Sequence, residues 1–259
     1  MAHPCRPRLV AAGFRGADGW ANQHRIVDGL VRGALAGGVE LRVGTAALQL
    51  EMRAGGLLGV VTSAGPIRAD AALIATGAWV TALLRPLDLA LPVKGRRHEL
   101  LIVEPTKPLP HELPWLIGVD DAVHTRGDVA GRALVGGFLG EDREVDPDAY
   151  DVRADPEWTH MVLEMAERVF GIVGPGAHVR DGWAGLYPGT PDRHPIIDRL
   201  ADGLFVSLGF AGTGLMLAPA AGRLAVELIV DGGIRSVDPK LLKADRFRHL
   251  SQTAETTGF

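Results

Sequence analysis

The sequence contains very little cysteine and carries little net charge. Only Cys5 among 259 residues is a cysteine, which excludes an intrachain disulfide and a thiolate metal cluster. The formal net charge of -4 gives no electrostatic reason to expect nucleic acid or an anionic membrane as a partner. No apolar run has the length that a bilayer requires, and no signal-peptide core follows the N-terminus. We therefore expect a cytoplasmic protein without membrane contact.

Three motifs that would carry other chemistry are also missing. The dinucleotide fingerprint G-x-G-x-x-G does not occur, so the chain lacks a recognisable pyrophosphate loop. No G-x-S-x-G nucleophile elbow is present, and the histidines show no metal-ligand spacing. Serine hydrolase chemistry and a metal site are therefore not expected.

Apolar periodicity instead divides the chain into three parts. The spacing predicts a helix over residues 24–36, and strands over 39–43, 57–62 and 69–75. In the middle, residues 100–103 and 133–138 are predicted strands, and a helix begins at Pro156 and ends at Gly171. The last part has a buried strand over 204–208 and a helix over 215–230. These patterns predict two domains, with the chain crossing between them twice.

The sharpest feature is the stretch from Leu204 to Pro219, LFVSLGFAGTGLMLAP. A strand runs through glycines into a helix, whose first amide groups form a site for negative charge. A phosphate fits such a site, and so does the electron-rich carbonyl oxygen of a flavin ring. The alternative is a glycine-rich turn before a core helix, which is common in α/β folds.

Four segments in the right order resemble the D-amino-acid oxidase-like superfamily of FAD-dependent oxidoreductases. They are residues 18–39, residues 69–79 followed by Leu91-Pro92-Val93 and Arg96-Arg97-His98, the WAGLYPGTPD segment from Trp183 with His194-Pro195-Ile196, and the 204–219 stretch. The superfamily includes glycine oxidase, sarcosine oxidase and dimethylglycine dehydrogenase. The resemblance covers about residues 9 to 250.

The resemblance implies a mixed α/β (α+β) fold with a discontinuous FAD-binding, Rossmann-like domain over residues 16–88 and 178–245. An antiparallel-sheet substrate domain is expected over residues 89–177. It also implies FAD as cofactor and hydride transfer from the carbon beside an amine. The positions implied for cofactor binding are Ala47, Thr76, Gly77, Trp79, Gly185, Gly209, Phe210, Gly212, Thr213, Gly214, Leu215 and Met216.

The sequence departs from the superfamily at its start. The superfamily begins with a strand, a G-x-G-x-x-G turn and a helix, and this chain has no such βαβ unit. Without that unit, neighbouring strands are expected to have exposed edges. Three explanations stay open: a truncated gene or misplaced start, a partner chain that supplies the unit, or a remnant without activity. We favour the first.

Three residues are predicted on the substrate side. Some relatives have an arginine where Tyr187 precedes Pro188, so Tyr187 is expected to donate one hydrogen bond to a substrate carboxylate. Arg97 is expected to attract the carboxylate, and His98 to adjust the protonation of the amine. The alternatives are a half-buried aromatic at a domain boundary for Tyr187 and a solvated basic turn for the other two.

The expected reaction is oxidation of the C–N bond of a small amino acid or an N-methylated amine to an imine, as with sarcosine or dimethylglycine. The alternative is a non-catalytic fragment or subunit that needs a partner chain. A third possibility is a protein that binds an anionic metabolite at the glycine-rich helix start.

Overall fold

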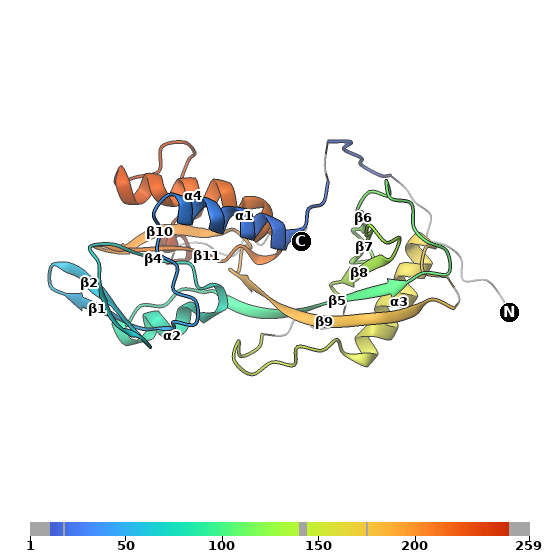
Figure 1. Ribbon diagram of the computed structural model, residues 1–259, viewed down its shortest axis with the longest axis horizontal. Helices are drawn as coiled ribbons and strands as arrows, with labels where there is room; N and C mark the ends of the chain where they lie inside the picture. Colours follow the sequence, from blue (N-terminus) through green and yellow to red (C-terminus); the bar gives the residue numbers. More distant parts are fainter. Residues whose placement is uncertain (1–10, 18, 140–143, 175, 249–259) are drawn as a thin grey trace. The chain divides into compact units, whose positions relative to one another are not determined.

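The computed structural model describes residues 11–17, 19–139, 144–174 and 176–248 (Figure 1). Its α-helices are α1 Gln23–Ala36, α2 Val80–Leu84, α3 Pro156–Phe170 and α4 Gly214–Val230. Its strands are β1 Ala47–Arg53, β2 Gly56–Thr62, β3 Gly65–Arg68, β4 Ala72–Ile74, β5 Lys94–Glu104, β6 Leu116–Gly118, β7 Val123–Gly127, β8 Ala133–Gly137, β9 His178–Gly189, β10 Ile196–Ala201 and β11 Leu204–Leu208. The mixed α/β class expected from the sequence is confirmed.

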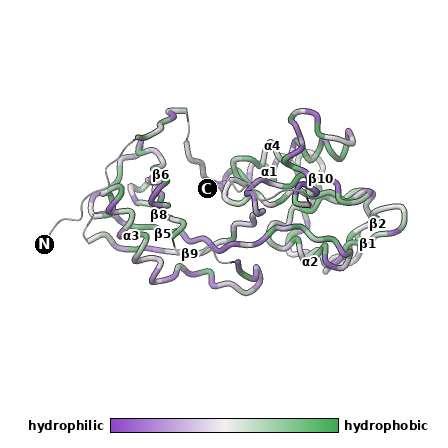
Figure 2. Tube along the Cα trace, turned by 180° about the vertical axis from the view of Figure 1, so that it is seen from behind, coloured by the Kyte–Doolittle hydropathy of each residue, from purple (hydrophilic) through white to green (hydrophobic). Residues whose placement is uncertain are grey.

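The chain forms two compact units, each built from separate segments. Unit 1 contains Met1–Asn22, Arg97–Arg143 and Asp148–Gly185, and unit 2 contains Gln23–Arg96, Glu144–Pro147 and Leu186–Phe259. The limits differ from the expected domains, because residues 16–22 and 178–185 belong to unit 1 and residues 89–96 and 144–147 to unit 2. The chain therefore passes between the units more often than the two times expected. Figure 2 shows hydrophobic residues in both units, and each unit has its own buried cluster.

Unit 2 contains two small sheets. Strands β1, β2 and β3 form an antiparallel sheet, and the second sheet has the order β10-β11-β4. Strand β4 is parallel to β11, and Val206 lies opposite Ile74. Helix α4 buries Ala221, Ala225 and Leu228, which recur at helical spacing and pack with Ile197 and Phe205.

Unit 1 is a five-stranded sheet covered on one face by α3. The strand order is β6-β7-β8-β5-β9. Helix α3 begins where Asp155 accepts hydrogen bonds from the amides of Glu157 and Trp158, at 2.9 and 3.0 Å, and it ends at Gly171 in the left-handed region. Its buried face packs against β5, β7 and β8 in one cluster. The cluster includes Leu101, Val103, Val123, Val135, Trp158, Val162 and Ala166.

The sequence patterns located most, but not all, of these elements. The predicted strand over residues 204–208 and the predicted helices at 24–36, 156–170 and 215–230 are confirmed to within a residue. The predicted strand over residues 39–43 is wrong. Val39, Leu41 and Val43 are exposed there, and Arg42 donates to Glu40 at 2.6 Å within the segment. This alternation has no neighbouring strand to pair with in the described residues, so no sheet forms.

Candidate functional site

The glycine-rich stretch lies at the end of a parallel strand pair in unit 2. Strands β4 and β11 run side by side in the same direction, so Thr76-Gly77 and Gly209-Phe210 follow at the same edge of the sheet. Gly77 and Gly209 have φ values of +56° and +81°, a conformation that side chains disfavour. A Cβ on Gly209 would lie 2.8 Å from Thr190 Cγ2. The carboxyl edge of parallel strands is where α/β folds bind ligands.

The end of β9 brings the two turns together. A Cβ on Gly77 would lie 3.3 Å from Pro188 Cγ, and Gly189 forms an antiparallel bridge with Phe210. A Cβ on Gly189 would lie 3.5 Å from Ala211 Cβ. The structure therefore gathers the predicted residues Thr76, Gly77 and Phe210 around one strand end. Tyr187 is the residue before Pro188 on that strand.

The opening of α4 is not capped by a side chain. The hydroxyl of Thr213 donates to the carbonyl of Phe210 at 2.8 Å and makes no cap bond to the helix. Leu215 and Met216 in the first turn are 43% and 73% exposed. The first amides of a helix have no partner within it, so this end attracts an oxygen with negative charge.

One buried polar atom at this edge lacks a partner. Among the described residues, the Thr76 hydroxyl is buried without a hydrogen bond. A buried hydroxyl of this kind normally has a partner, because an unsatisfied one is costly. The unsatisfied hydroxyl, the glycine turns and the uncapped helix together fit a bound group with polar oxygens, such as a flavin dinucleotide.

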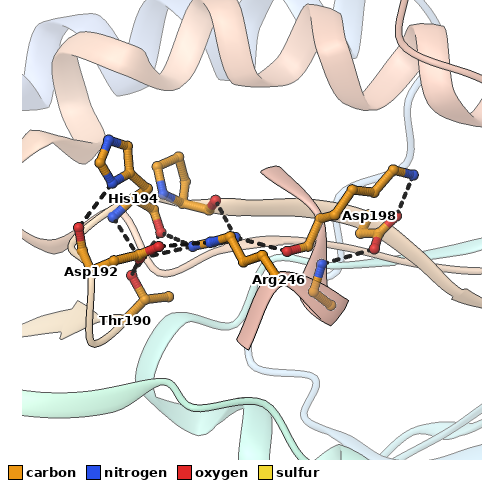
Figure 3. Close-up of polar contacts among 8 residues, drawn as sticks. Thr190, Asp192, His194, Asp198 and Arg246 are labelled. Carbon is orange, nitrogen blue, oxygen red and sulfur yellow. Dashed lines mark hydrogen bonds and ion pairs between the residues drawn. The ribbon is translucent and has the colours of Figure 1, made fainter. Parts of the chain in front are cut away.

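A buried ion pair fixes the loop beside Gly209, and the sequence reasoning missed it. Arg246 donates from Nε to Asp192 Oδ2 at 2.8 Å and from Nη2 to Asp192 Oδ1 at 3.0 Å (Figure 3). It also bonds to the carbonyls of His194, Pro195 and Lys243. The Thr190 hydroxyl bonds to Asp192 Oδ1 at 2.9 Å and to the His194 carbonyl at 2.7 Å.

The carboxyl group of Asp192 in this ion pair is ionised at neutral pH. Burial raises the pKa of Asp192, but hydrogen bonds from Arg246 and Thr190 outweigh burial, and the net pKa lies below its ordinary value. A second pair, Lys243 with Asp198 at 2.8 Å, joins the same C-terminal segment to β10. Residues far along the chain thus fix the position of the Thr-Pro-Asp segment.

Three other predicted cofactor positions lie in three separate elements of the fold. Ala47 is exposed at the start of β1 in the other sheet of unit 2, opposite Thr62. Trp79 is 45% exposed, directly after Gly77 and Ala78. Gly185 belongs to unit 1, and a Cβ there would meet nothing within 4 Å. The roles predicted for these three residues stay predictions.

The predicted substrate-side residues are distributed over both units. Burial raises the pKa of Tyr187, so its hydroxyl stays protonated and able to donate. Arg97 lies in unit 1, where it donates to the Asp151 and Arg153 carbonyls at 2.9 and 2.5 Å and pairs with Glu99. His98, on the opposite face of β5, has its ring centroid 5.0 Å from that of Phe138. Their catalytic roles stay predictions.

The sequence matches one protein family over most of its length. Residues 2–228 match the family described as FAD dependent oxidoreductase. The chain is 34% identical over 191 residues to the glycine oxidase of Pseudomonas aeruginosa, which covers 71% of this chain and 48% of that protein. It is 32% identical over 242 residues to a D-amino acid dehydrogenase of Methylobacterium nodulans, covering 88% of this chain and 54% of that one.

Solved structures agree with this fold. The chain superposes on the L-proline dehydrogenase from P. horikoshii with a TM-score of 0.75 at 22% identity, covering 87% of this chain and 59% of that one. For the glycine oxidase from Geobacillus kaustophilus the TM-score is 0.70 at 22% identity, with 85% and 57% covered. The chain thus spans about half the length of the curated relatives it matches.

Proposed function

Because this chain belongs to the FAD-dependent oxidoreductase family, we propose that it is part of an enzyme that oxidises the C–N bond of a small amino acid or N-methylated amine. The observation that supports this most directly is the junction of β11 and α4. Gly209 is packed on Thr190 there, and the helix opening has no side-chain cap. FAD, when bound, supplies the acceptor for the hydride that leaves the carbon beside nitrogen.

The residues of unit 2 have distinct tasks in this proposal. The amides that open α4, from Gly214 to Met216, would hold a flavin carbonyl oxygen and stabilise negative charge near the ring. Thr76 would complete its hydrogen bonding on the dinucleotide. Gly77 and Gly209 would keep the backbone close to the cofactor, because both turns have a positive φ that side chains disfavour.

For the substrate, we propose an amino acid that carries one or two methyl groups on its nitrogen. Tyr187 is a protonated donor that offers one hydrogen bond where some relatives have an arginine. We propose that it contacts the substrate, with N-methylglycine or N,N-dimethylglycine as the class to test. The imine formed would then be hydrolysed by water.

The test uses the complete product of the gene that encodes these residues, together with any partner chain that purifies with it. The protein is loaded with FAD and mixed without oxygen with glycine, N-methylglycine, N,N-dimethylglycine and D-alanine. We expect one of these amines to bleach the visible flavin absorbance. A protein that retains FAD yet leaves it oxidised with every amine would contradict the proposal.

We also propose that a segment outside residues 1–259 completes the FAD site, supplied either by the same polypeptide or by a partner chain. Val27, Leu30 and Leu35 on α1 are 48–56% exposed, and Met216 and Val230 on α4 are 73% and 74% exposed. Strand β4 ends its sheet with one unpaired edge in the described residues, and Leu73 on it is 41% exposed. A parallel strand followed by a helix would pair with that edge and cover apolar surface.

Flavin retention tests this second proposal. Purified alone and mixed with FAD, the chain is expected to lose its flavin spectrum on desalting, because residues 1–259 contain no G-x-G-x-x-G turn to bind the pyrophosphate. Retention of flavin by the chain alone would contradict the requirement for another segment.

The expectation that no apolar run has the length of a bilayer is wrong for one helix in the described part of the chain. Residues Ala211–Val230 form a helix long and apolar enough, by length and composition, to cross a membrane. We propose instead that the exposed face of α4 is covered by protein in a cytoplasmic enzyme, since Ala221, Ala225 and Leu228 already pack on the sheet of unit 2.

A further inference from the structure

The face of the unit 1 sheet that does not carry α3 has side chains aligned across three strands. His124 on β7 lies opposite Gly136 on β8, which in turn lies opposite Leu100 on β5. In the next row Arg126 lies opposite Leu134. Along β7, Val123 and Thr125 are buried while His124 and Arg126 are half-buried, so the two basic residues share the face away from the core.

Glycine at position 136 makes room for the imidazole of His124. A Cβ on Gly136 would lie 2.4 Å from His124 Cε1 and 2.6 Å from Nε2, so the ring lies directly over the glycine. The indole Nε1 of Trp115 donates to His124 Nδ1 at 3.4 Å, with the ring centroids 5.4 Å apart. Because an indole only donates, Nδ1 is the acceptor and the proton of the neutral ring is on Nε2.

Arg126 is oriented but not neutralised. Its guanidinium carbon lies 4.7 Å from the ring centroid of Trp20, and Nη1 donates to the carbonyl of Gly127 at 3.2 Å. The nearby carboxylate of Asp128 is bound by Arg132 at 2.6 Å. Arg126 has no ion-pair partner in the part of the chain that the structure describes. Stacking covers one face of a guanidinium and leaves donors at its edge available.

We infer that Arg126 and His124 form a subsite for the carboxylate of the amino-acid substrate on this face, an inference that rests on the proposed function. The guanidinium edge would bind the carboxylate, His124 Nε2 would donate a further hydrogen bond, and the apolar neighbours Leu100 and Leu134 would contact the carbon skeleton. Arg97 is less suited to this task, because Glu99 and two backbone carbonyls already bind it.

Electrostatics agree with this geometry. Burial and the neighbouring charge of Arg126 lower the pKa of His124 to about 4, so the ring is a neutral donor at neutral pH. Burial also lowers the pKa of Arg126 itself, and a bound anion would offset that cost. The site therefore offers one uncompensated positive charge for one carboxylate.

The test compares an acid with its uncharged amide. Tryptophan fluorescence, reported by Trp20 and Trp115, follows binding of N-methylglycine and of N-methylglycinamide to the wild-type chain and to R126M, R126K and R180M. Arg180 is the matched control, because it is 58% exposed and pairs with Glu104 on the same sheet. Thermal unfolding of each variant verifies folding.

We expect the wild type to bind the acid more tightly than the amide. R126M should weaken binding of the acid by about tenfold or more, with the amide unchanged, since hydrogen bonds to a charged group are lost. R126K keeps the charge without the fork and should weaken the acid by a smaller factor. If R126M does not fold, R126K alone decides.

Several results would overturn the inference: no binding of the acid by the wild type, unchanged affinity in R126M or in a folded R126K, or equal loss in R180M. Flavin reduction in the completed enzyme is measured separately at saturating amine. An enzyme active on amines whose R126M variant keeps its KM would retain the proposed function and lose this subsite. Binding that depends on Arg126 without any flavin reduction would do the reverse.

Discussion

At the scale of single residues, two arginines differ in how their charge is balanced. Arg246 is almost fully buried and bonds to both oxygens of Asp192 and to three carbonyls. Arg126 is half-buried, stacked on Trp20, and has no carboxylate partner in the described residues. A fully satisfied ion pair has a structural task, whereas an oriented and unpaired charge is suited to an anionic ligand.

Removal of Arg246 should strongly destabilise unit 2. Arg246→Met leaves the carboxylate of Asp192 buried without its partner, and we expect a loss of about 3–5 kcal/mol in the free energy of unfolding, measured with urea. The exposed Arg199→Met, on β10 of the same unit, is the control and should change stability by less than about 0.5 kcal/mol. A second substitution, Asp192→Asn, should restore part of the loss. Equal effects of the two arginine variants would contradict a structural role for the pair.

Stability should also depend on pH through His124. Its folded pKa of about 4 lies below the ordinary 6.5, so the unfolded chain binds this proton more readily. Its contribution to stability is therefore complete above about pH 7 and is lost as pH falls through 6.5 toward 4, by about 2 kcal/mol at about pH 5. His124→Gln should remove that part of the pH dependence, whereas the exposed His111→Gln should not. Urea unfolding of both variants at several pH values measures this difference.

The sequence revealed some of these residues and hid others for a physical reason. Gly209 and Gly214 belong to a strand-glycine-helix pattern that is recognisable from the local sequence alone. Arg246 lies 54 residues from Asp192, and nothing local distinguishes it from a surface arginine. Arg126 and His124 acquire their surroundings only when three strands align. Contacts of this kind depend on sheet register, which one sequence does not specify.

At the scale of elements, the junction of β11 and α4 requires glycine at position 209. The reason is the backbone conformation and the close packing there, and not the helix propensity of glycine. Gly209→Ala places a Cβ 2.8 Å from Thr190 Cγ2 in a left-handed conformation, and we expect a loss of about 1–3 kcal/mol together with weaker FAD binding in the completed protein. Gly222→Ala, inside α4 with nothing within 4 Å, should stabilise by about 0.5–1 kcal/mol. Thermal unfolding of both variants measures the difference. Destabilisation by Gly222→Ala of the same size would show that the effect is not specific to the junction.

The same scale explains which elements the sequence predicted well. Strand β11 is apolar and buried on both faces, and its limits were predicted to the residue. Residues 39–43 alternate in the same way as a strand but have no partner strand in the described part of the chain. An alternating pattern specifies a strand only where a neighbour exists to pair with it.

At the scale of the whole molecule, the exposed apolar surface of unit 2 should govern how the chain behaves alone. Val226 and Val230 on α4 are 58% and 74% exposed, a combination that favours association. We expect the isolated chain to self-associate as its concentration rises in sedimentation velocity, and the double variant V226K/V230K to associate less. Val129, 76% exposed in unit 1, supplies the control V129K, which should leave association unchanged.

A further comparison distinguishes nonspecific self-association of the chain from the lack of a specific segment that packs on α4. If such a segment packs on α4, joining it to the chain should abolish self-association, and V226K/V230K should then lower the melting temperature of the joined protein because two charges would be buried at the new contact. A chain that stays monomeric at all concentrations would contradict an uncovered apolar face. A joined protein whose melting temperature is insensitive to both lysines would place the additional segment elsewhere, away from α4.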